Sequence, residues 1–137
     1  MKNDCLFCAI IHDEMPAHKI YEDDTFIAIL DRFPKCPGHI LVMPKVHARG
    51  LFDMPEETLS KLLPLAKKLA EKLRAAVKPE GLNLLQNNGK AAGQAIDHFH
   101  LHLIPRYDKD DMVFQWKTVD PSPEEFADMV EKLKKPG

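Results

Sequence analysis

Residues 98–105 of this 137-residue chain have the sequence HFHLHLIP, in which three histidines recur at strict two-residue intervals. Successive side chains of a β-strand point to opposite faces of the sheet, so His98, His100 and His102 would share one face. The apolar residues between them would line the other face and become buried. The stretch therefore predicts a strand with a buried apolar face and a polar face.

The three histidines could form a metal cluster, a catalytic strand or a polar decoration of the sheet. At a rise of about 3.3 Å per residue the outer pair is about 13 Å apart, so a tetrahedral zinc ion could bind two of them but hardly all three. A polar sheet face without a function would explain one or two such histidines better than three in register. Catalysis is favoured, because an imidazole with a pKa near ~6.5 is neutral and nucleophilic at pH 7 and can still transfer protons.

The loop before this strand, residues 87–97 (NNGKAAGQAID), is rich in glycine, alanine and amide side chains. It could be an ordinary hairpin connection. Glycine, however, allows close backbone approach and outward-facing N–H groups, which suit a phosphate oxygen. Because the loop continues directly into the histidine strand, we interpret it as a phosphate-binding loop whose amide donors converge with a nucleophilic imidazole.

The remaining sequence predicts an α+β fold, with an antiparallel meander sheet of about five strands, one long helix and short N- and C-terminal helices. The expected elements are a helix over 4–12, strands over 18–22, 25–30 and 39–44, a long helix after residue 53, strands over 81–86 and 98–105, and a final helix from 123 to about 134. We expect one domain over 1–137, with a core over 4–107 and a tail over 108–137.

Helix-start signals accompany both later helices. Asp53, followed by Glu56 and with Pro55 in the first turn, predicts the start of the long helix, and Ser122 with Glu125 predicts the start of the last one. Pro64 is expected to kink the long helix without breaking it. The apolar stripe predicted for the long helix comprises Leu59, Leu62, Leu63, Ala66, Leu69, Ala70 and Leu73.

Composition argues against several classes of protein. The formal net charge of −2 does not suit a broad cationic surface for nucleic acid. There is no apolar run of roughly 18 residues, as a membrane span requires, and the N-terminus does not resemble a secretory signal. The three cysteines, an odd number, fit a reducing compartment better than a disulfide scaffold. We therefore expect a cytoplasmic protein with neither nucleic acid nor membrane as a partner.

Three blocks of the sequence together resemble the histidine triad (HIT) family. AGQAIDHFHLHLIPR is similar to its Gly-Gln-x-x-x-His-x-His-x-His block, PGHILVMPKVH to its Gly-His-x-Leu-x-x-Pro-Lys block, and YEDDTFIAILD to its strand pair ending in an acidic or amide residue. The tail with Trp116 also resembles bacterial members. The resemblance covers approximately residues 4–107 and implies a nucleotide hydrolase or transferase acting at the α-phosphate of a purine nucleotide derivative.

The resemblance also implies residue roles. His100 would be the nucleophile, forming a nucleotidyl-histidine intermediate that water later resolves. His102 would bind the phosphate and, with His98 and His39, orient the imidazole and manage protons. The residues implied in nucleotide binding are Phe7, Ile10 and Ile29 at the base, Asp31 at the ribose, and Asn87, Gly93, Gln94 and Ala95 beside the phosphate, together with His100 and His102. The family further implies a homodimer whose sheets join across the two-fold axis.

The chain departs from the family at Ala95, two residues after the loop glycine. Nucleoside phosphoramidase members often have Ser there, and another branch has Thr. A hydroxyl group that could assist the leaving group is therefore absent.

The pair Cys5 and Cys8 has three interpretations: half of a zinc site, a redox dithiol or two chance cysteines. The redox interpretation is the weakest, because no thioredoxin-like strand and helix surround the pair. Zinc needs two more ligands, and several histidines are available. By resemblance to zinc-bearing members, the set would be Cys5, Cys8, His47 and His98, holding one structural zinc per chain. We expect no organic cofactor.

Two other functions compete with the enzyme hypothesis. The chain could be a nucleotide-sensing scaffold module in which hydrolysis is incidental, or a zinc-stabilised interaction domain without a nucleotide site. The loop and the histidine strand favour the enzyme.

Overall fold

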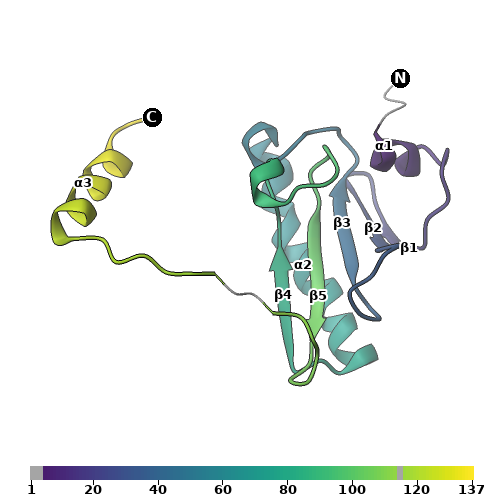
Figure 1. Cartoon of the computed structure of the whole chain (residues 1–137). Helices are drawn as coiled ribbons and strands as arrows, with labels where there is room; N and C mark the ends of the chain where they lie inside the picture. The colour runs from purple at the N-terminus through teal and green to yellow at the C-terminus, as the bar shows by residue number, and fades with distance from the viewer. Residues whose placement is uncertain (1–4, 114–115) are drawn as a thin grey trace.

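The computed structural model of the chain describes residues 5–113 and 116–137 (Figure 1). Its centre is an antiparallel sheet with the strand order β1-β2-β3-β5-β4. The strands are β1 (Lys19–Glu22), β2 (Phe26–Leu30), β3 (Ile40–Pro44), β4 (Gly81–Leu85) and β5 (Leu101–Arg106). The helices are α1 (Leu6–Ile11), α2 (Glu56–Val77) and α3 (Pro123–Lys134), with 3-10 turns η1 (Leu51–Asp53) and η2 (Lys90–Ala92). The α+β prediction is confirmed, while the expected helix start at residue 4 lies outside the described residues.

Both faces of the sheet are covered. On one face, alternate residues of the central strands, such as Val42 and Leu103, pack with Leu69 of α2. On the other face, Ile29 and Leu41 pack with residues of α1 and its flanks. The long helix and the N-terminal helix therefore enclose the sheet from opposite sides, and the histidines lie on the α1 side.

The predicted strand start at residue 98 is wrong, because β5 begins only at Leu101. The N–H of Phe99 donates to the carbonyl of Ala48, which lies outside the strands, and the N–H of His98 donates to Ile96 within its own loop. The expected alternation nevertheless persists, since Phe99 and Leu101 are buried against the α2 side. Only His102 of the three histidines belongs to β5.

The predicted start of the long helix at Asp53 is also wrong. The Asp53 carboxylate accepts the backbone N–H groups of Arg49 and Gly50, each at 3.0 Å, and so closes the turn before η1. Helix α2 begins three residues later at Glu56, with Pro55 as its N-cap. The acidic residue therefore stabilises a tighter turn upstream of the helix.

The buried stripe of α2 keeps the predicted Leu62, Ala66, Leu69 and Leu73 but differs at neighbouring positions. Leu63 is 62% exposed, whereas Leu65 is buried. The helix continues without a break through Pro64. Its buried residues are Leu62, Leu65, Ala66, Leu69 and Leu73.

Helix α3 confirms its predicted cap. The Ser122 hydroxyl accepts the Glu125 N–H at 3.1 Å, and the Glu125 carboxylate accepts the Ser122 N–H at 2.8 Å. The helix stands away from the sheet at the end of an extended arm, and none of its residues is buried (Figure 1). Among the described residues, no helix is both long and apolar enough to cross a membrane.

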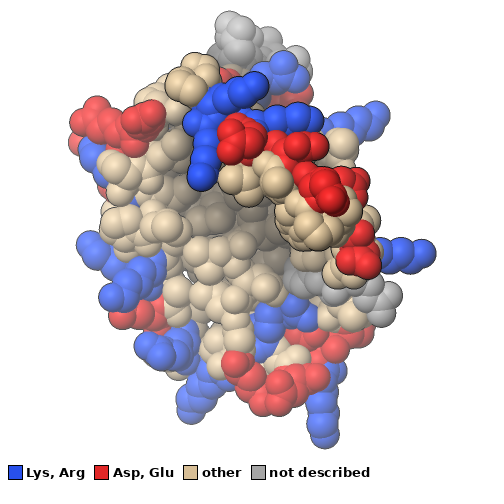
Figure 2. All heavy atoms as spheres, turned by 90° about the vertical axis from the view of Figure 1, so that its left-hand side faces the viewer, with Lys and Arg blue, Asp and Glu red and all other residues tan. Residues whose placement is uncertain are grey.

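The two edge strands differ in charge. Lys19 and Glu22 of β1 form an ion pair with one another, and both have further charged partners in Asp13 and Lys45. Strand β4 has no charged residue and exposes Leu84. Viewed from the α3 side, the molecule shows a hollow whose centre lacks charged side chains, with lysine, arginine and acidic residues gathered around it (Figure 2).

Candidate active site and metal cluster

A cavity of about 930 Å³ lies beside α1, the turn between β2 and β3, and the loop before β5. Its volume and mainly apolar wall suit a small organic ligand. The predicted site residues that line it are Phe7, Ile10, Ile29, Asp31, His39, Asn87, Gly93, Ala95, His100 and His102. The fold thus brings residues from five separate segments of the sequence to one cavity.

A wider cavity of about 1350 Å³ lies on the other side of the same loop. Gln94, Ala95 and His47 are among its lining residues, but neither His100 nor His102 is. We therefore place the candidate chemistry in the smaller cavity.

His100 is held with one nitrogen free. Its Nδ1 donates to the backbone carbonyl of His98 at 2.8 Å, so in the neutral ring the lone pair resides on Nε2. Phe7 packs edge-on against the imidazole, with ring centroids 5.0 Å apart. Burial lowers the pKa of His100, which favours the neutral form. A neutral, oriented imidazole is suited to nucleophilic attack.

His102 and His39 form a short contact at the rim of the cavity, with 2.9 Å between His102 Nδ1 and His39 Nε2. Asp31 Oδ2 lies 3.4 Å from the same nitrogen of His39. Burial, reinforced by the charge of neighbouring histidines, lowers the pKa of His102 to about 4. Burial also lowers the pKa of His39. Both rings are therefore neutral at pH 7.

The group Asp31, His39 and His102 is close enough to invite a metal, because its ligand atoms lie within 4.8 Å of one another. A metal would need the lone pair of His39 Nε2. However, His39 Nδ1 already accepts the backbone N–H of Lys35 at 3.1 Å, so Nε2 carries the proton of the neutral ring. These residues suit hydrogen bonding better than metal coordination.

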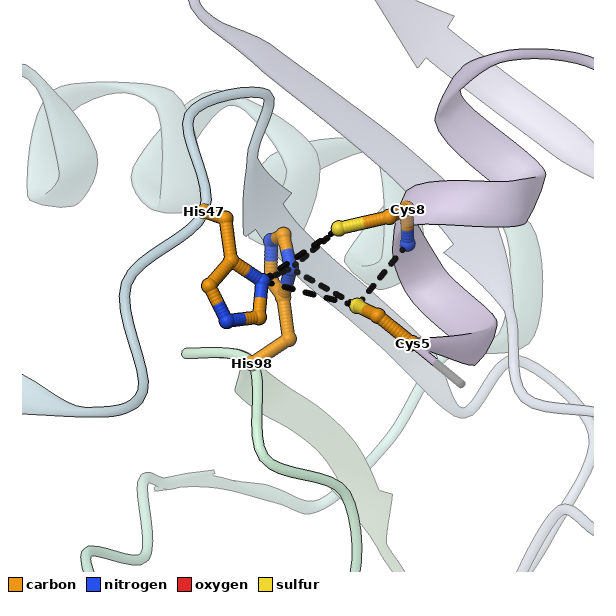
Figure 3. A group of neighbouring side chains, drawn as sticks. All are labelled: Cys5, Cys8, His47 and His98. Atoms are coloured by element: carbon orange, nitrogen blue, oxygen red, sulfur yellow. Dashed lines mark hydrogen bonds between the residues drawn. The ribbon is translucent and has the colours of Figure 1, made fainter. Parts of the chain in front are cut away.

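The second group, Cys5, Cys8, His47 and His98, has the donor geometry of a tetrahedral metal site (Figure 3). The four distances between a cysteine sulfur and a histidine Nδ1 are 3.3–3.6 Å, and the two Nδ1 atoms are 3.2 Å apart. Zinc with bonds near ~2.3 Å to sulfur and ~2.0 Å to nitrogen spaces its ligand atoms roughly 3.3–3.8 Å apart.

The outer nitrogen of His98 completes this fit. Nε2 donates to the backbone carbonyl of Pro44 at 2.8 Å, which leaves the Nδ1 lone pair facing the two sulfur atoms. A ligand histidine typically donates its other N–H to such an acceptor. The cysteines come from the start of α1, His47 follows β3 and His98 precedes β5, so one ion would join three segments (Figure 3). The residues fit zinc.

Gln94, which was predicted to contact the phosphate, lines the wider cavity and not the smaller one. Its Oε1 accepts the Gly89 N–H at 2.8 Å, and its Nε2 donates to the carbonyls of Arg49 and Ile96 at 2.6 and 3.0 Å. The side chain thus fixes the loop conformation, with Gly93 in a left-handed conformation at φ 95°. A direct contact of Gln94 with phosphate stays a prediction.

Sequence reasoning missed two kinds of residue at these sites. Leu6 and the segment 15–18 line the cavity without a recognisable pattern. Lys35 and Pro44 act through backbone atoms, for which a side-chain motif gives no signal. The Pro-rich turn before β3 was the one available hint for Lys35.

Comparison with known proteins agrees with this geometry. The HIT domain family matches residues 12–109, which is most of the chain. The chain belongs to the HIT family. This match confirms the family resemblance drawn from the histidine strand and its neighbouring blocks.

Three relatives describe the family around this chain. The adenosine 5'-monophosphoramidase HNT1 of Saccharomyces cerevisiae is 42% identical over 132 residues, covering 96% of this chain and 78% of that protein. The crystal structure of a HIT family member from Bacillus subtilis has a TM-score of 0.90 and 37% identity, covering 96% and 95% of the two chains. A Zn-bound histidine triad family protein from Mycobacterium smegmatis has a TM-score of 0.75 and 39% identity, covering 93% and 91%.

Proposed function

We propose that this HIT protein hydrolyses purine nucleotide derivatives at the α-phosphate, through a covalent intermediate on His100. Dinucleoside polyphosphates and nucleoside phosphoramidates are the substrate classes. The observation that carries the proposal is the contact of His100 Nδ1 with the His98 carbonyl, which leaves Nε2 as the free nucleophilic nitrogen in the cavity. The yeast relative, named an adenosine 5'-monophosphoramidase, supports this type of substrate.

The first half-reaction is attack of His100 Nε2 on the α-phosphorus. As the new phosphorus–nitrogen bond forms, the bond to the leaving group breaks and its electron pair stays with the leaving atom. The imidazolium that develops is stabilised by its hydrogen bond to the His98 carbonyl, at 2.8 Å. His102 donates a hydrogen bond to a phosphate oxygen, where negative charge accumulates.

In the second half-reaction water attacks the same phosphorus atom. The phosphorus–nitrogen bond breaks and its electron pair returns to Nε2, while the attacking water loses one proton to solvent and a nucleoside monophosphate is released. Dividing one displacement into two steps lowers each barrier, since the imidazole is both a good nucleophile and a good leaving group.

Substrate positioning follows from the lining of the cavity. The base would lie among Phe7, Ile10 and Ile29, which are all buried apolar side chains. Asp31 would accept the ribose hydroxyls. Asn87 and the backbone near Gly93 would contact the phosphate, with Gln94 contributing through the loop that it holds.

We also propose that Cys5, Cys8, His47 and His98 hold one structural zinc ion. The support is the spacing of their donor atoms and the Zn-bound relative. Such an ion, when bound, cross-links α1 to the segments that carry His47 and His98 through coordination bonds. The chain has three cysteines, an odd number, which fits a reducing compartment better than a disulfide scaffold, so we assign the protein to the cytoplasm.

The same reasoning extends to the assembly. We propose a single HIT domain over residues 1–137 that pairs with a second copy through β4. An uncharged, unpaired edge strand is a ready site for strand pairing, whereas the charged β1 edge disfavours it. Light scattering of the wild-type protein and Leu84→Arg tests this, with a monomeric variant and a dimeric wild type expected; a wild-type monomer contradicts it.

The central experiment compares His100→Ala with His12→Ala, which removes an exposed histidine outside the cavity. Turnover of an adenosine phosphoramidate should fall at least about a thousand-fold in the first variant and remain unchanged in the second. Calorimetric titration with AMP should still show binding to both. Retained turnover in His100→Ala would overturn the proposal.

A further inference from the structure

The turn between β2 and β3 presents one backbone N–H to the inner nitrogen of His39. The N–H of Lys35 lies 3.1 Å from His39 Nδ1. An N–H group can only donate, so Nδ1 must be an acceptor without a proton. The single proton of the neutral ring is then on Nε2. Because Pro34 and Pro37 have no N–H, few donors in this turn could take the place of Lys35.

This assignment determines the tautomer of His102 as well. His39 Nε2 and His102 Nδ1 are 2.9 Å apart, a separation that requires one proton between them. Since His39 Nε2 carries that proton, His39 donates the hydrogen bond and His102 Nδ1 accepts it. The proton of neutral His102 is consequently on Nε2, the nitrogen on the opposite side of the ring from His39.

Two hydrogen bonds and the conformation of one glycine hold the turn in place. The Asp31 carboxylate accepts the Phe33 N–H at 3.0 Å, and the His39 N–H donates to the Cys36 carbonyl at 3.2 Å. Gly38 has φ 92°, a conformation that L-residues rarely adopt. The Lys35 N–H is therefore positioned by the turn itself and not by the Lys35 side chain.

We propose that the Lys35 backbone N–H is a tautomer lock that, through His39, keeps His102 in its Nε2–H form as a hydrogen-bond donor to the substrate phosphate. Lys35 is thus a positioning residue that acts through its backbone. The tautomer assignment stands on the hydrogen bonds alone, while its role in turnover rests on the proposed function.

Without the Lys35 N–H the two tautomers of His39 would mix, since only the more distant Asp31 carboxylate, 3.4 Å from His39 Nε2, would still favour a proton on that nitrogen. A neutral His39 free of the Lys35 N–H can carry its proton on either nitrogen. When the proton moves to His39 Nδ1, His39 Nε2 becomes an acceptor, and His102 must supply the proton from its own Nδ1. His102 would then present an acceptor to an anionic phosphate, which repels it.

The experiment measures the ring nitrogens directly in the full-length protein labelled with ¹⁵N-histidine. Protonated and unprotonated imidazole nitrogens have well-separated ¹⁵N resonances, so each tautomer has its own signature. Lys35→Ala keeps the N–H and removes the ammonium group. Lys35→Pro removes the N–H, and a backbone ester at residue 35, made by semisynthesis, replaces the N–H by oxygen while it keeps the side chain.

In the wild-type protein and in Lys35→Ala we expect unprotonated Nδ1 and protonated Nε2 on His102. In the ester, and in Lys35→Pro if it folds, both nitrogens should shift toward averaged positions. A wild-type His102 with its proton on Nδ1 would overturn the assignment. An ester with unchanged His102 resonances would overturn the lock, and backbone amide spectra verify that the fold is retained.

Turnover is measured on the same samples. The ester should lower kcat about five-fold, which corresponds to about 1 kcal/mol, the net contribution of one hydrogen bond. Lys35→Ala keeps the N–H but loses a side chain at the wall of the cavity, so its kcat reports the contribution of the side chain apart from that of the backbone. If the wild-type protein turns over no nucleotide substrate, the proposed function fails while the resonances still decide the lock. If turnover is normal in the ester despite mixed tautomers, the lock has no catalytic role and that part of the inference fails.

Discussion

The Nδ1 atom of His100 lies 2.8 Å from the backbone carbonyl oxygen of His98. This contact links two sites, because the ring of His98 belongs to the Cys5 and Cys8 cluster while its carbonyl orients the candidate nucleophile. The His98 ring is further fixed by Pro44. The cysteine and histidine cluster and the cavity that contains His100 therefore share one residue, which contacts each through a different group.

Loss of the metal should consequently lower turnover as well as stability. Cys8→Ser should retain less than about half an equivalent of zinc per chain by elemental analysis. Its free energy of unfolding should fall by about 3–4 kcal/mol when zinc is present at a hundred to a thousand times its Kd. We also expect kcat to fall, because the His98 carbonyl is less firmly held.

The third cysteine supplies the control for that experiment. Cys36 lies outside the cluster, and its thiol donates to the Pro105 carbonyl at 3.3 Å. Cys36→Ser should retain full zinc and wild-type turnover. A Cys8→Ser variant with normal zinc content, or with normal kcat after zinc is lost, would break the proposed connection between the two sites.

Two leucines of α2 test where the core lies. Leu69 is 1% exposed and packs against the sheet, whereas Leu63 on the same helix is 62% exposed. Leu69→Ala should lower the free energy of unfolding by about 2–5 kcal/mol, because it leaves a cavity. Leu63→Ala should change it by less than about 0.5 kcal/mol. Equal losses in urea titrations would contradict the observed burial.

The pair Arg106 and Asp110 makes stability depend on pH. Two hydrogen bonds of 2.9 Å from the Arg106 guanidinium hold the pKa of the Asp110 carboxyl well below its usual range. A pKa that is lower in the folded state adds stability above the unfolded pKa, near ~4, and that stability is lost as the pH falls. Asp110→Asn should therefore be less stable at pH 7 and lose less stability between about pH 5 and pH 3.

Urea titrations across this pH range measure the difference. The adjacent Asp111 is exposed, so Asp111→Asn should keep the wild-type stability at pH 7 and controls for the loss of one negative charge. If the Asp110→Asn and wild-type curves stay parallel below pH 5, the ion pair does not contribute in this way.

Side-chain patterns predicted most of the fold, because β2, β3, β5 and α2 each bury apolar residues of their own. The alternation in β5 and the Ser122 cap were both accessible in this way. The start of β5 could not be predicted from side-chain patterns, because it depends on which carbonyl accepts the Phe99 N–H. The cysteine and histidine cluster was predicted by family resemblance, which also supplied the distant ligand His47.

The groups that determine the histidine tautomers could not be recognised in the sequence. The His98 and Pro44 carbonyls and the Lys35 N–H are backbone atoms that every sequence contains. Only the folded chain shows which of them face an imidazole. A candidate nucleophile can thus be proposed from the side-chain pattern, while the position of its proton requires the folded structure.

Ala95 provides a final test of the chemistry, because it lines the cavity where family members often have a hydroxyl residue. Ala95→Ser should raise kcat/KM for an adenosine phosphoramidate about two- to ten-fold, the value of one hydrogen bond to a basic leaving group. A dinucleoside polyphosphate, whose weakly basic phosphate leaves without a proton, should show no gain. Ala92→Ser, in the same loop but away from the cavity, is the matched control. Equal gains for both substrates would show that the hydroxyl acts on binding and not on the leaving group.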